Sequence, residues 1–231
     1  MGAVVKAGGR CGSDLHFAAH GREFNAATQA AGGFDVMDLN QPVIFGHEFV
    51  GRIAAYGHDT AARIPVGGRV VSAPFLLHEQ KITLGVAGPE APGGYSERML
   101  LSEPLLIEVP DHVPTELAAL TEPLAVAYRT VARVDTSTED AALVIGCGPI
   151  GLAVIAVLKM KGISPIVASD FSPERRALAR QLGVDVVVDP NESSPYEAFR
   201  AAAMTDDGVA DAFERLRNSP REAKILIDPT R

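Results

Sequence analysis

The segment 143-LVIGCGPIG-151 decides the fold of this chain. Its first three residues predict a buried strand, its glycines predict a tight turn, and the apolar spacing over residues 152–161 predicts a helix. Gly146 permits the turn, Gly148 lets backbone amides approach a pyrophosphate, and Gly151 lets the helix pack closely on the strand. The helix N-terminus then offers free N–H groups to the phosphates. We therefore expect a dinucleotide-binding unit here.

The residues after this unit indicate which dinucleotide it binds. A second apolar strand over residues 165–169 ends at Asp170, where a carboxylate can bind the adenosine ribose hydroxyls. An acid there favours NAD, because it repels the extra phosphate of NADP. Arg175 and Arg176 follow closely and leave NADP open, and a glycine-rich turn without a ligand is the alternative for the loop alone. The predicted cofactor-binding residues are Gly146, Gly148, Pro149, Ile150, Gly151, Asp170 and Arg175.

Composition narrows the class of protein. The chain has 231 residues, 47% of them hydrophobic and 22% charged, with a net charge of −8, which is ordinary for a soluble globular protein. It has no Lys/Arg cluster, and this argues against nucleic acid or an anionic membrane as partner. No apolar run could span a bilayer and no signal-peptide layout is present, so we expect a cytoplasmic protein. Only Cys11 and Cys147 are present, which excludes a disulfide framework.

Three short stretches carry groups that suit a metal. The segment 11-CGSDLH-16 combines a thiol, a hydroxyl, a carboxylate and an imidazole, although a polar loop with one buried thiol explains it equally well. In 46-GHEFVG-51, His47 and Glu48 stand between glycines that let the backbone bend, but such a pair is more often solvated. Glu122 precedes Pro123 inside an apolar helical pattern over residues 114–134. A solvent-facing turn before a proline kink is favoured there over a metal-directed carboxylate.

The remaining segments organise the two halves of the chain. Turns and short strands over residues 65–71, 98–101 and 105–109 are typical of a small antiparallel barrel. Residues 20–40 have little periodicity and predict an irregular surface excursion. In the second half, a helix over residues 172–182 and a strand over 184–189 continue the strand–helix alternation.

Together, five motifs resemble the zinc-dependent medium-chain dehydrogenase family of the alcohol and polyol dehydrogenase type. They are 11-CGSDLH-16, 46-GHEFVG-51, 67-GGRV-70, 122-EPL-124 and 146-GCGPIG-151. The resemblance implies an α/β protein with a mostly β GroES-like barrel domain and an abbreviated Rossmann-type parallel sheet as second domain. The expected limits are 1–137 for the GroES-like catalytic domain, 138–206 for the partial NAD-binding domain, and 207–231 for a C-terminal helix and strand that return to the catalytic domain.

The resemblance also implies one catalytic zinc and no structural zinc. Cys11 and His47 look like zinc ligands, and Glu48 looks like a ligand or a close neighbour of the ion. Glu122 stands where the family has a third cysteine or a glutamate, which sometimes reaches zinc through water. A thiolate and an imidazole favour zinc over magnesium or calcium, whose preferred ligands are oxygens.

The implied reaction transfers a hydride between a secondary alcohol or polyol and NAD. The expected catalytic residues are Ser13, His16 and Glu48. Ser13 resembles the hydroxyl that passes the substrate proton outward, and His16 is expected to continue that relay. Asp14 is expected to orient a ligand imidazole. The expected partner is a small-molecule substrate, and a homo-oligomer is left open.

The length of the chain argues for a shortened form of this family. Ten residues precede Cys11, so the barrel is expected to lack an opening hairpin. The 42 residues after Asp189 are fewer than the roughly 80–100 of a second mononucleotide half, with the gap expected near residues 204–208. We expect an exposed edge at the third strand. The rival function is a shortened, non-catalytic dinucleotide-binding or interaction protein, and a zinc-free reductase is disfavoured because it needs none of the four metal donors.

Overall fold

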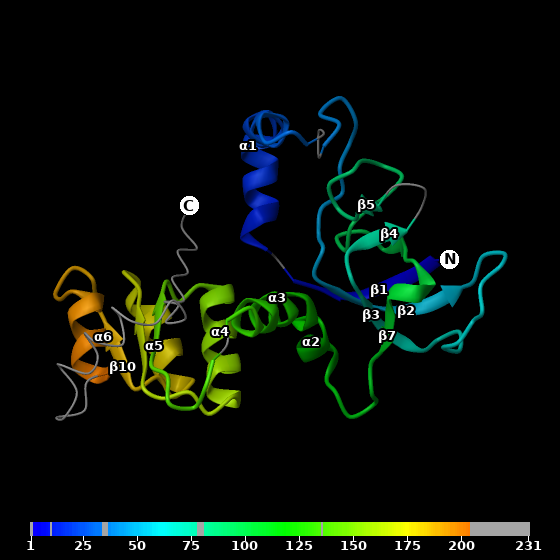
Figure 1. The fold of residues 1–231 in the computed structure, drawn as a ribbon. Helices are drawn as coiled ribbons and strands as arrows, with labels where there is room; N and C mark the ends of the chain where they lie inside the picture. The colour runs from blue at the N-terminus through cyan, green and yellow to red at the C-terminus, as the bar shows by residue number, and fades with distance from the viewer. Residues whose placement is uncertain (1, 10, 34–36, 78–80, 135, 204–231) are drawn as a thin grey trace. The chain divides into compact units, whose positions relative to one another are not determined.

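The computed structural model describes residues 2–9, 11–33, 37–77, 81–134 and 136–203 (Figure 1). The chain divides into two compact units, Met1–Glu122 and Pro123–Arg231. The first unit is mostly β, and the second alternates parallel strands with helices. The fold class expected from the sequence is therefore confirmed. The predicted limits 1–137 and 138–206 stay a prediction, and the predicted tail 207–231 and the gap near residues 204–208 lie outside the described residues.

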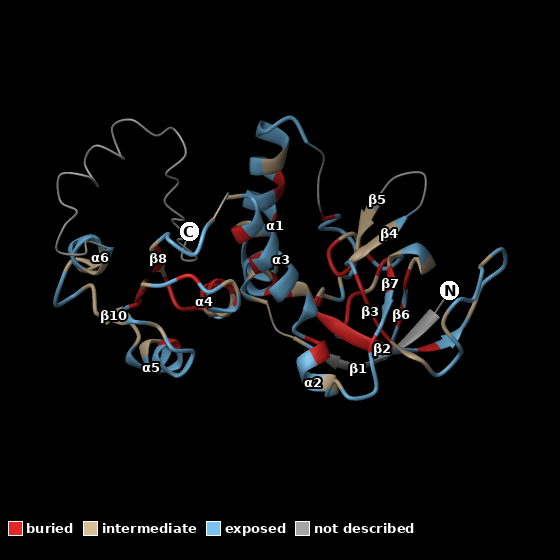
Figure 2. Cartoon of the chain, turned by 60° about the horizontal axis from the view of Figure 1, so that its bottom comes forward, coloured by how far each residue is buried: buried red, intermediate tan, exposed pale blue. Residues whose placement is uncertain are grey.

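The first unit is built on a five-stranded antiparallel sheet of order β6-β1-β2-β3-β7. Its strands are β1 (Gly2–Gly8), β2 (Phe49–Ala55), β3 (Arg69–Ser72), β6 (Arg98–Leu100) and β7 (Leu106–Glu108). A separate hairpin pairs β4 (Phe75–Leu77) with β5 (Lys81–Thr83). Figure 2 shows β2 largely buried. Buried residues of β2, β3 and β6 form the core, among them Phe49, Ile53, Val70 and Met99. This is the antiparallel half that the sequence predicts.

The register of β1 on β2 brings two distant motifs together. Gly8 lies opposite Phe49, so the residues that follow β1 run beside the residues that precede β2. The N–H of Gly9 donates to the carbonyl of Glu48 at 2.9 Å. Cys11 and His47 are thereby delivered to the same end of the sheet.

A long helix contradicts part of the excursion predicted for residues 20–40. Helix α1 spans Gly12–Ala30, with a kink at His20 where φ is −131°. Its second half is fixed by contacts that periodicity does not encode. The buried Asn25 amide donates to the carbonyl of Met37 at 2.7 Å and accepts from the N–H of Met37 at 3.2 Å. The prediction of irregular structure was wrong for residues 20–30, because polar tertiary contacts replace an apolar stripe.

The helical pattern predicted for residues 114–134 forms two helices rather than one. A 3₁₀ turn, η1 (Glu103–Leu105), comes first along the chain, and α2 (Thr115–Ala118) and α3 (Thr121–Ala132) follow β7. Pro123 lies in the first turn of α3, where its missing N–H has no helical acceptor to lose. The expected proline kink is therefore absent here, because the proline lies at the beginning of a helix.

The second unit contains a three-stranded parallel sheet of order β10-β9-β8. Its elements are β8 (Ala142–Ile145), α4 (Pro149–Met160), β9 (Ile166–Ser169), α5 (Pro173–Gln181), β10 (Val186–Val188) and α6 (Pro195–Ala203). Neighbouring residues of β8 pack on opposite faces of the sheet, Val144 with residues of α4 and Leu143 with residues of α6. Covering both faces explains why these strands read as unbroken apolar runs.

The outer strands of this sheet refine the prediction of an exposed edge. Within the described residues, β10 lies at one edge, as expected for the third strand, and β8 lies at the other. In a complete doubly wound sheet the further strands add beside the first strand. The edge that a second half would cover is therefore β8. None of the described helices has the length and apolar character needed to cross a membrane.

Candidate metal centre and dinucleotide site

Three side chains of the first unit converge at the end of the β1–β2 pair. The Cys11 sulfur, a His47 ring nitrogen and a Glu48 carboxylate oxygen all lie within 4.8 Å of one another. Zinc–ligand distances of about 2.0–2.3 Å keep the donors of one shell less than about 4.5 Å apart. The cluster therefore has about the dimensions of a zinc shell, and its thiol, imidazole and carboxylate are the ligand types that zinc takes. This fit supports the predicted ligands, which stay a prediction.

The thiol and the imidazole of this cluster shift each other's pKa. Its hydrogen bond with Cys11 raises the pKa of His47 to about 9, with the charge of Asp14 assisting and burial opposing. The same bond lowers the pKa of Cys11, while burial raises it. The Ser13 hydroxyl donates to the Cys11 sulfur at 3.1 Å and also favours the thiolate. These contacts therefore favour the thiolate form of Cys11 and the protonated form of His47.

Asp14 holds the imidazole in orientation, as expected. Its Oδ1 lies 3.1 Å from Nδ1 of His47, and its Oδ2 accepts a hydrogen bond from the Tyr95 hydroxyl at 2.8 Å. Asp14 is only 3% exposed. With Nδ1 bound to the carboxylate, Nε2 is the nitrogen of His47 left for a metal.

Two further carboxyl groups lie in the surroundings of His47. Burial raises the pKa of Glu48, which is 6% exposed, and burial likewise raises the pKa of Glu122. The charge of Glu122 also contributes to the raised pKa of His47, so the group lies within electrostatic reach of the centre. Glu122 is not one of the three residues whose donor atoms meet. The predicted role of Glu122 at the zinc, directly or through water, stays a prediction.

The remaining predicted relay residue lies further along α1. His16 is exposed, and its ring centroid is 6.2 Å from that of His20. Its predicted role stays a prediction. Sequence reasoning missed Gly9 and Tyr95, which contact Glu48 and Asp14. The glycine pair before Tyr95, in the segment 93-GGYSE-97, was a usable signal because it marks a close backbone approach.

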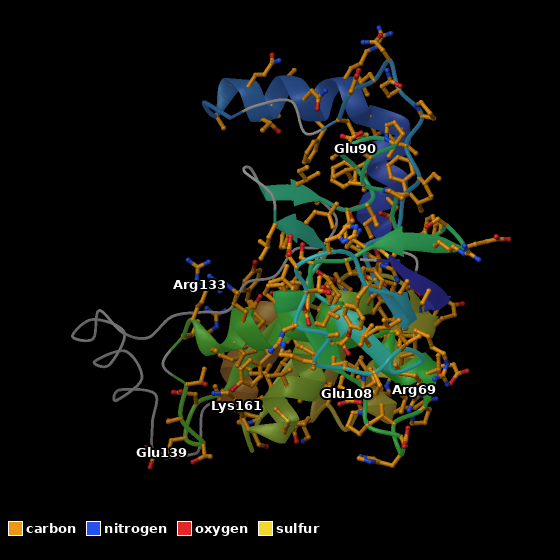
Figure 3. All side chains as sticks on the ribbon, turned by 90° about the vertical axis from the view of Figure 1, so that its right-hand side faces the viewer. Arg69, Glu90, Glu108, Arg133, Glu139 and Lys161 are labelled. Atoms are coloured by element: carbon orange, nitrogen blue, oxygen red, sulfur yellow. The ribbon has the colours of Figure 1, made fainter. Side chains whose placement is uncertain are left out.

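Arg69 explains the motif 67-GGRV-70. It lies at the start of β3 and is labelled in Figure 3. Its guanidinium donates to the carbonyls of Pro110 at 2.7 Å and of Val113 at 2.9 Å. These bonds tie the chain between β7 and α2 to the sheet, and this chain leads on to Glu122. Arg69 is therefore structural.

The glycine turn of the second unit has the geometry that its predicted tasks require. Gly146 has φ +91°, a left-handed conformation that favours glycine. A β-carbon on Gly151 would lie 1.9 Å from the Gly146 carbonyl oxygen. A β-carbon on Gly148 would meet nothing closer than Arg175 Nη1, at 4.0 Å. Pro149 and Ile150 are the first two residues of helix α4, and the free N–H groups of this first turn face the loop.

Asp170 joins the glycine turn to the end of β9. It is 8% exposed, its Oδ2 accepts the N–H of Cys147 at 2.7 Å, and its Oδ1 accepts the N–H of Ser172 at 2.8 Å. Each carboxylate oxygen has a second lone pair, which leaves capacity for the predicted ribose contact.

The two arginines after Asp170 have different surroundings. Arg176 pairs with Asp189 at 2.7 Å and donates to the Asp170 carbonyl at 2.8 Å, so it is held within the fold. The Arg175 side chain is 48% exposed, and its Nη1 lies 3.7 Å from Asp170 Oδ2. Arg175 is therefore the more exposed of the two arginines, and its predicted role in cofactor binding stays a prediction.

Comparison with known proteins assigns the family. The alcohol dehydrogenase GroES-like domain model matches residues 3–111, and the zinc-binding dehydrogenase model matches residues 149–220. L-threonine 3-dehydrogenase of Sinorhizobium fredii is 32% identical over 248 residues, covering 97% of this chain and 68% of that protein. The chain belongs to the zinc-dependent medium-chain dehydrogenase family.

This chain is also similar to two further proteins. (R,R)-butanediol dehydrogenase of Bacillus subtilis is 39% identical over 220 residues, covering 91% of this chain and 61% of that protein. The crystal structure of the butanediol enzyme from the same organism matches with a TM-score of 0.67 and 36% identity, over 93% of this chain and 59% of that chain. A structure from Escherichia coli CFT073, described as a short chain alcohol dehydrogenase in complex with NADH, gives 0.72 and 26%, over 88% and 59%. This chain therefore spans about 61% of the first relative.

Proposed function

We propose that this chain carries the zinc centre and the first nucleotide-binding half of an NAD-dependent dehydrogenase that acts on a secondary alcohol or polyol. The observation that carries the proposal is the convergence of Cys11, His47 and Glu48 within 4.8 Å. A zinc ion held there supplies a Lewis acid that polarises the substrate oxygen.

The residues around the donor atoms orient the His47 ring and favour the thiolate form of Cys11. Asp14 keeps the His47 ring oriented, and the thiolate form of Cys11 is already favoured by its neighbours. Ser13 holds a hydroxyl proton 3.1 Å from the Cys11 sulfur, and we assign it the outward transfer of the substrate proton. His16, exposed on the same helix, continues that transfer to solvent.

NAD is the proposed cofactor. The buried Asp170 carboxylate stands at the end of β9 beside the glycine turn, where an acid favours free ribose hydroxyls over a 2′-phosphate. Arg176 is engaged by Asp189, which removes one of the two arginines that could attract such a phosphate, while Arg175 stays exposed and keeps NADP as the alternative. The NADH-bound Escherichia coli relative supports a nicotinamide cofactor.

Turnover tests this function directly. The zinc-loaded protein is mixed with NAD and either (R,R)-butanediol or L-threonine, the compounds named for its relatives, and NADH is followed by absorbance. We expect NADH to form with at least one alcohol of a wider secondary-alcohol panel and to vanish in Cys11→Ser. Turnover that is equal in Cys11→Ser and in the parent protein would contradict the proposal.

A second candidate is a dinucleotide-binding protein without turnover. The described parallel sheet has three strands, the number in one mononucleotide half, and this observation favours recognition of the ADP-ribose portion alone. Calorimetric titration separates the two functions. Binding of both NADH and ADP-ribose with equal affinity, together with no turnover, would identify the second candidate.

A further inference from the structure

We propose that Tyr95 is a positioning residue for His47 and that it acts through Asp14. The inference rests on the proposed role of His47 as a metal ligand. It extends the site by a residue to which the sequence motifs assign no role.

The side-chain path consists of two hydrogen bonds in series. The Tyr95 hydroxyl donates to Asp14 Oδ2 at 2.8 Å, and Asp14 Oδ1 lies 3.1 Å from His47 Nδ1. The two partners occupy different oxygens of one buried carboxylate, so together they fix its rotation. Removing the tyrosine hydroxyl would leave His47 as the only described restraint on that carboxylate and would cost a buried oxygen one of its donors.

The backbone of the same segment holds the residues before His47. Gly93 donates to Ile44 at 2.7 Å, Gly94 donates to Gly46 at 2.7 Å, and Tyr95 donates to Phe45 at 3.1 Å. These three bonds place the residues before Tyr95 and the residues before His47 in one rigid frame.

Glycines make this contact possible. A β-carbon on Gly93 would lie 2.3 Å from the Gly46 carbonyl oxygen, and Gly46 itself has φ +102°. A β-carbon on Gly46 would lie 2.9 Å from the Tyr95 nitrogen. The two segments therefore approach each other as closely as bare backbone permits, and the position of Tyr95 relative to His47 is fixed before the side chains interact.

The hydroxyl then connects this frame to a third segment. Helix α1 begins directly after Cys11, and Asp14 lies in its first turn. Tyr95 thus links the segment that carries His47 to the helix that begins after the other proposed ligand. The Tyr95 residue is 46% exposed, and Tyr95→Phe keeps the ring while it removes the hydroxyl. That substitution therefore separates the effect of the hydrogen bond from that of ring packing.

Zinc affinity of Tyr95→Phe tests the inference, measured by competition with a chromophoric chelator. Loss of an outer-shell partner typically weakens metal binding about 10–100-fold, and we expect roughly tenfold here, with a small decrease in the melting temperature of the metal-free protein because Asp14 Oδ2 loses a donor. Tyr56→Phe is the matched control, because its hydroxyl bonds to Ile64 in the same unit. The control should keep the parent affinity. Cobalt(II) loaded in place of zinc should show a shifted d–d absorption only in Tyr95→Phe.

A double-mutant cycle with Asp14→Ala gives the decisive comparison. If Tyr95 acts through Asp14, Tyr95→Phe has no further effect on zinc affinity in the Asp14→Ala protein. Equal losses in both backgrounds, or parent affinity in Tyr95→Phe, would overturn the inference while leaving the zinc centre intact. A parent protein that binds no zinc, or binds it equally after Cys11→Ser, would overturn the proposed function itself.

Discussion

The carboxylate of Glu48 lies directly against the backbone of Gly9. A β-carbon built on Gly9 would come within 1.9 Å of Glu48 Oε2 and within 2.9 Å of its Cβ. The N–H of Gly9 also donates to the Glu48 carbonyl at 2.9 Å. The absence of a side chain at position 9 is therefore what allows Glu48 to reach the cluster.

Replacing Gly9 by alanine should expel the Glu48 carboxylate from the metal centre. We expect Gly9→Ala to weaken zinc binding about tenfold or more, because the Glu48 carboxylate, as a ligand or as a close neighbour of the ion, would move away. Chelator competition measures the change. Gly12→Ala is the control, since a β-carbon at Gly12 meets nothing within 4 Å. Parent-like zinc affinity in Gly9→Ala would show that Glu48 does not need this space.

The two cysteines should react differently with iodoacetamide. The hydrogen bond with His47 lowers the pKa of Cys11, whereas burial raises the pKa of Cys147 to about 11. Because the thiolate is the reactive form, metal-free protein at pH 7.5 should be labelled at Cys11 and spared at Cys147. Added zinc should protect Cys11. Mass spectrometry of the labelled peptides decides, and similar labelling of both sites, or no protection by zinc, would count against the assignment.

Alanine substitutions at two glycines of the turn should affect different properties, stability at Gly151 and NADH binding at Gly148. Gly151→Ala places a β-carbon 1.9 Å from a backbone oxygen, so we expect a lower melting temperature. At Gly148 the added β-carbon has open space in this structure but would occupy the side on which the pyrophosphate is expected. Gly148→Ala should therefore melt like the parent and lose NADH affinity, as fluorescence titration can measure. Tight NADH binding by Gly148→Ala would contradict the predicted cofactor site.

The sequence predicts those parts of the molecule in which a few consecutive residues determine the local geometry. The glycine turn at residues 146–151 and the two apolar strands beside it form as expected, because only glycine tolerates the turn and the close helix contact. The convergence of Cys11 with His47 was inferred from a family resemblance. Its physical cause is the register of β1 on β2, and spacing alone does not reveal that register.

The parts that escaped prediction depend on contacts between distant residues. The second half of α1 is held by Asn25 through the backbone of Met37, so no apolar periodicity announces it. Tyr95 and Asp14 are 81 positions apart, and nothing local links a tyrosine near a barrel strand to a carboxylate on a helix. Pro123 was interpreted as a kink because its position in the pattern did not reveal that α3 begins only at Thr121.

X-ray absorption spectroscopy at the zinc edge tests the central claim most directly. With Cys11, His47 and Glu48 as ligands, the zinc-loaded protein should show one sulfur at about 2.3 Å and nitrogen or oxygen neighbours at about 2.0–2.2 Å. Cys147→Ala should leave this spectrum unchanged, because the Cys147 thiol is buried in the other unit. A zinc shell without sulfur, or one whose sulfur survives Cys11→Ser, would contradict the claim.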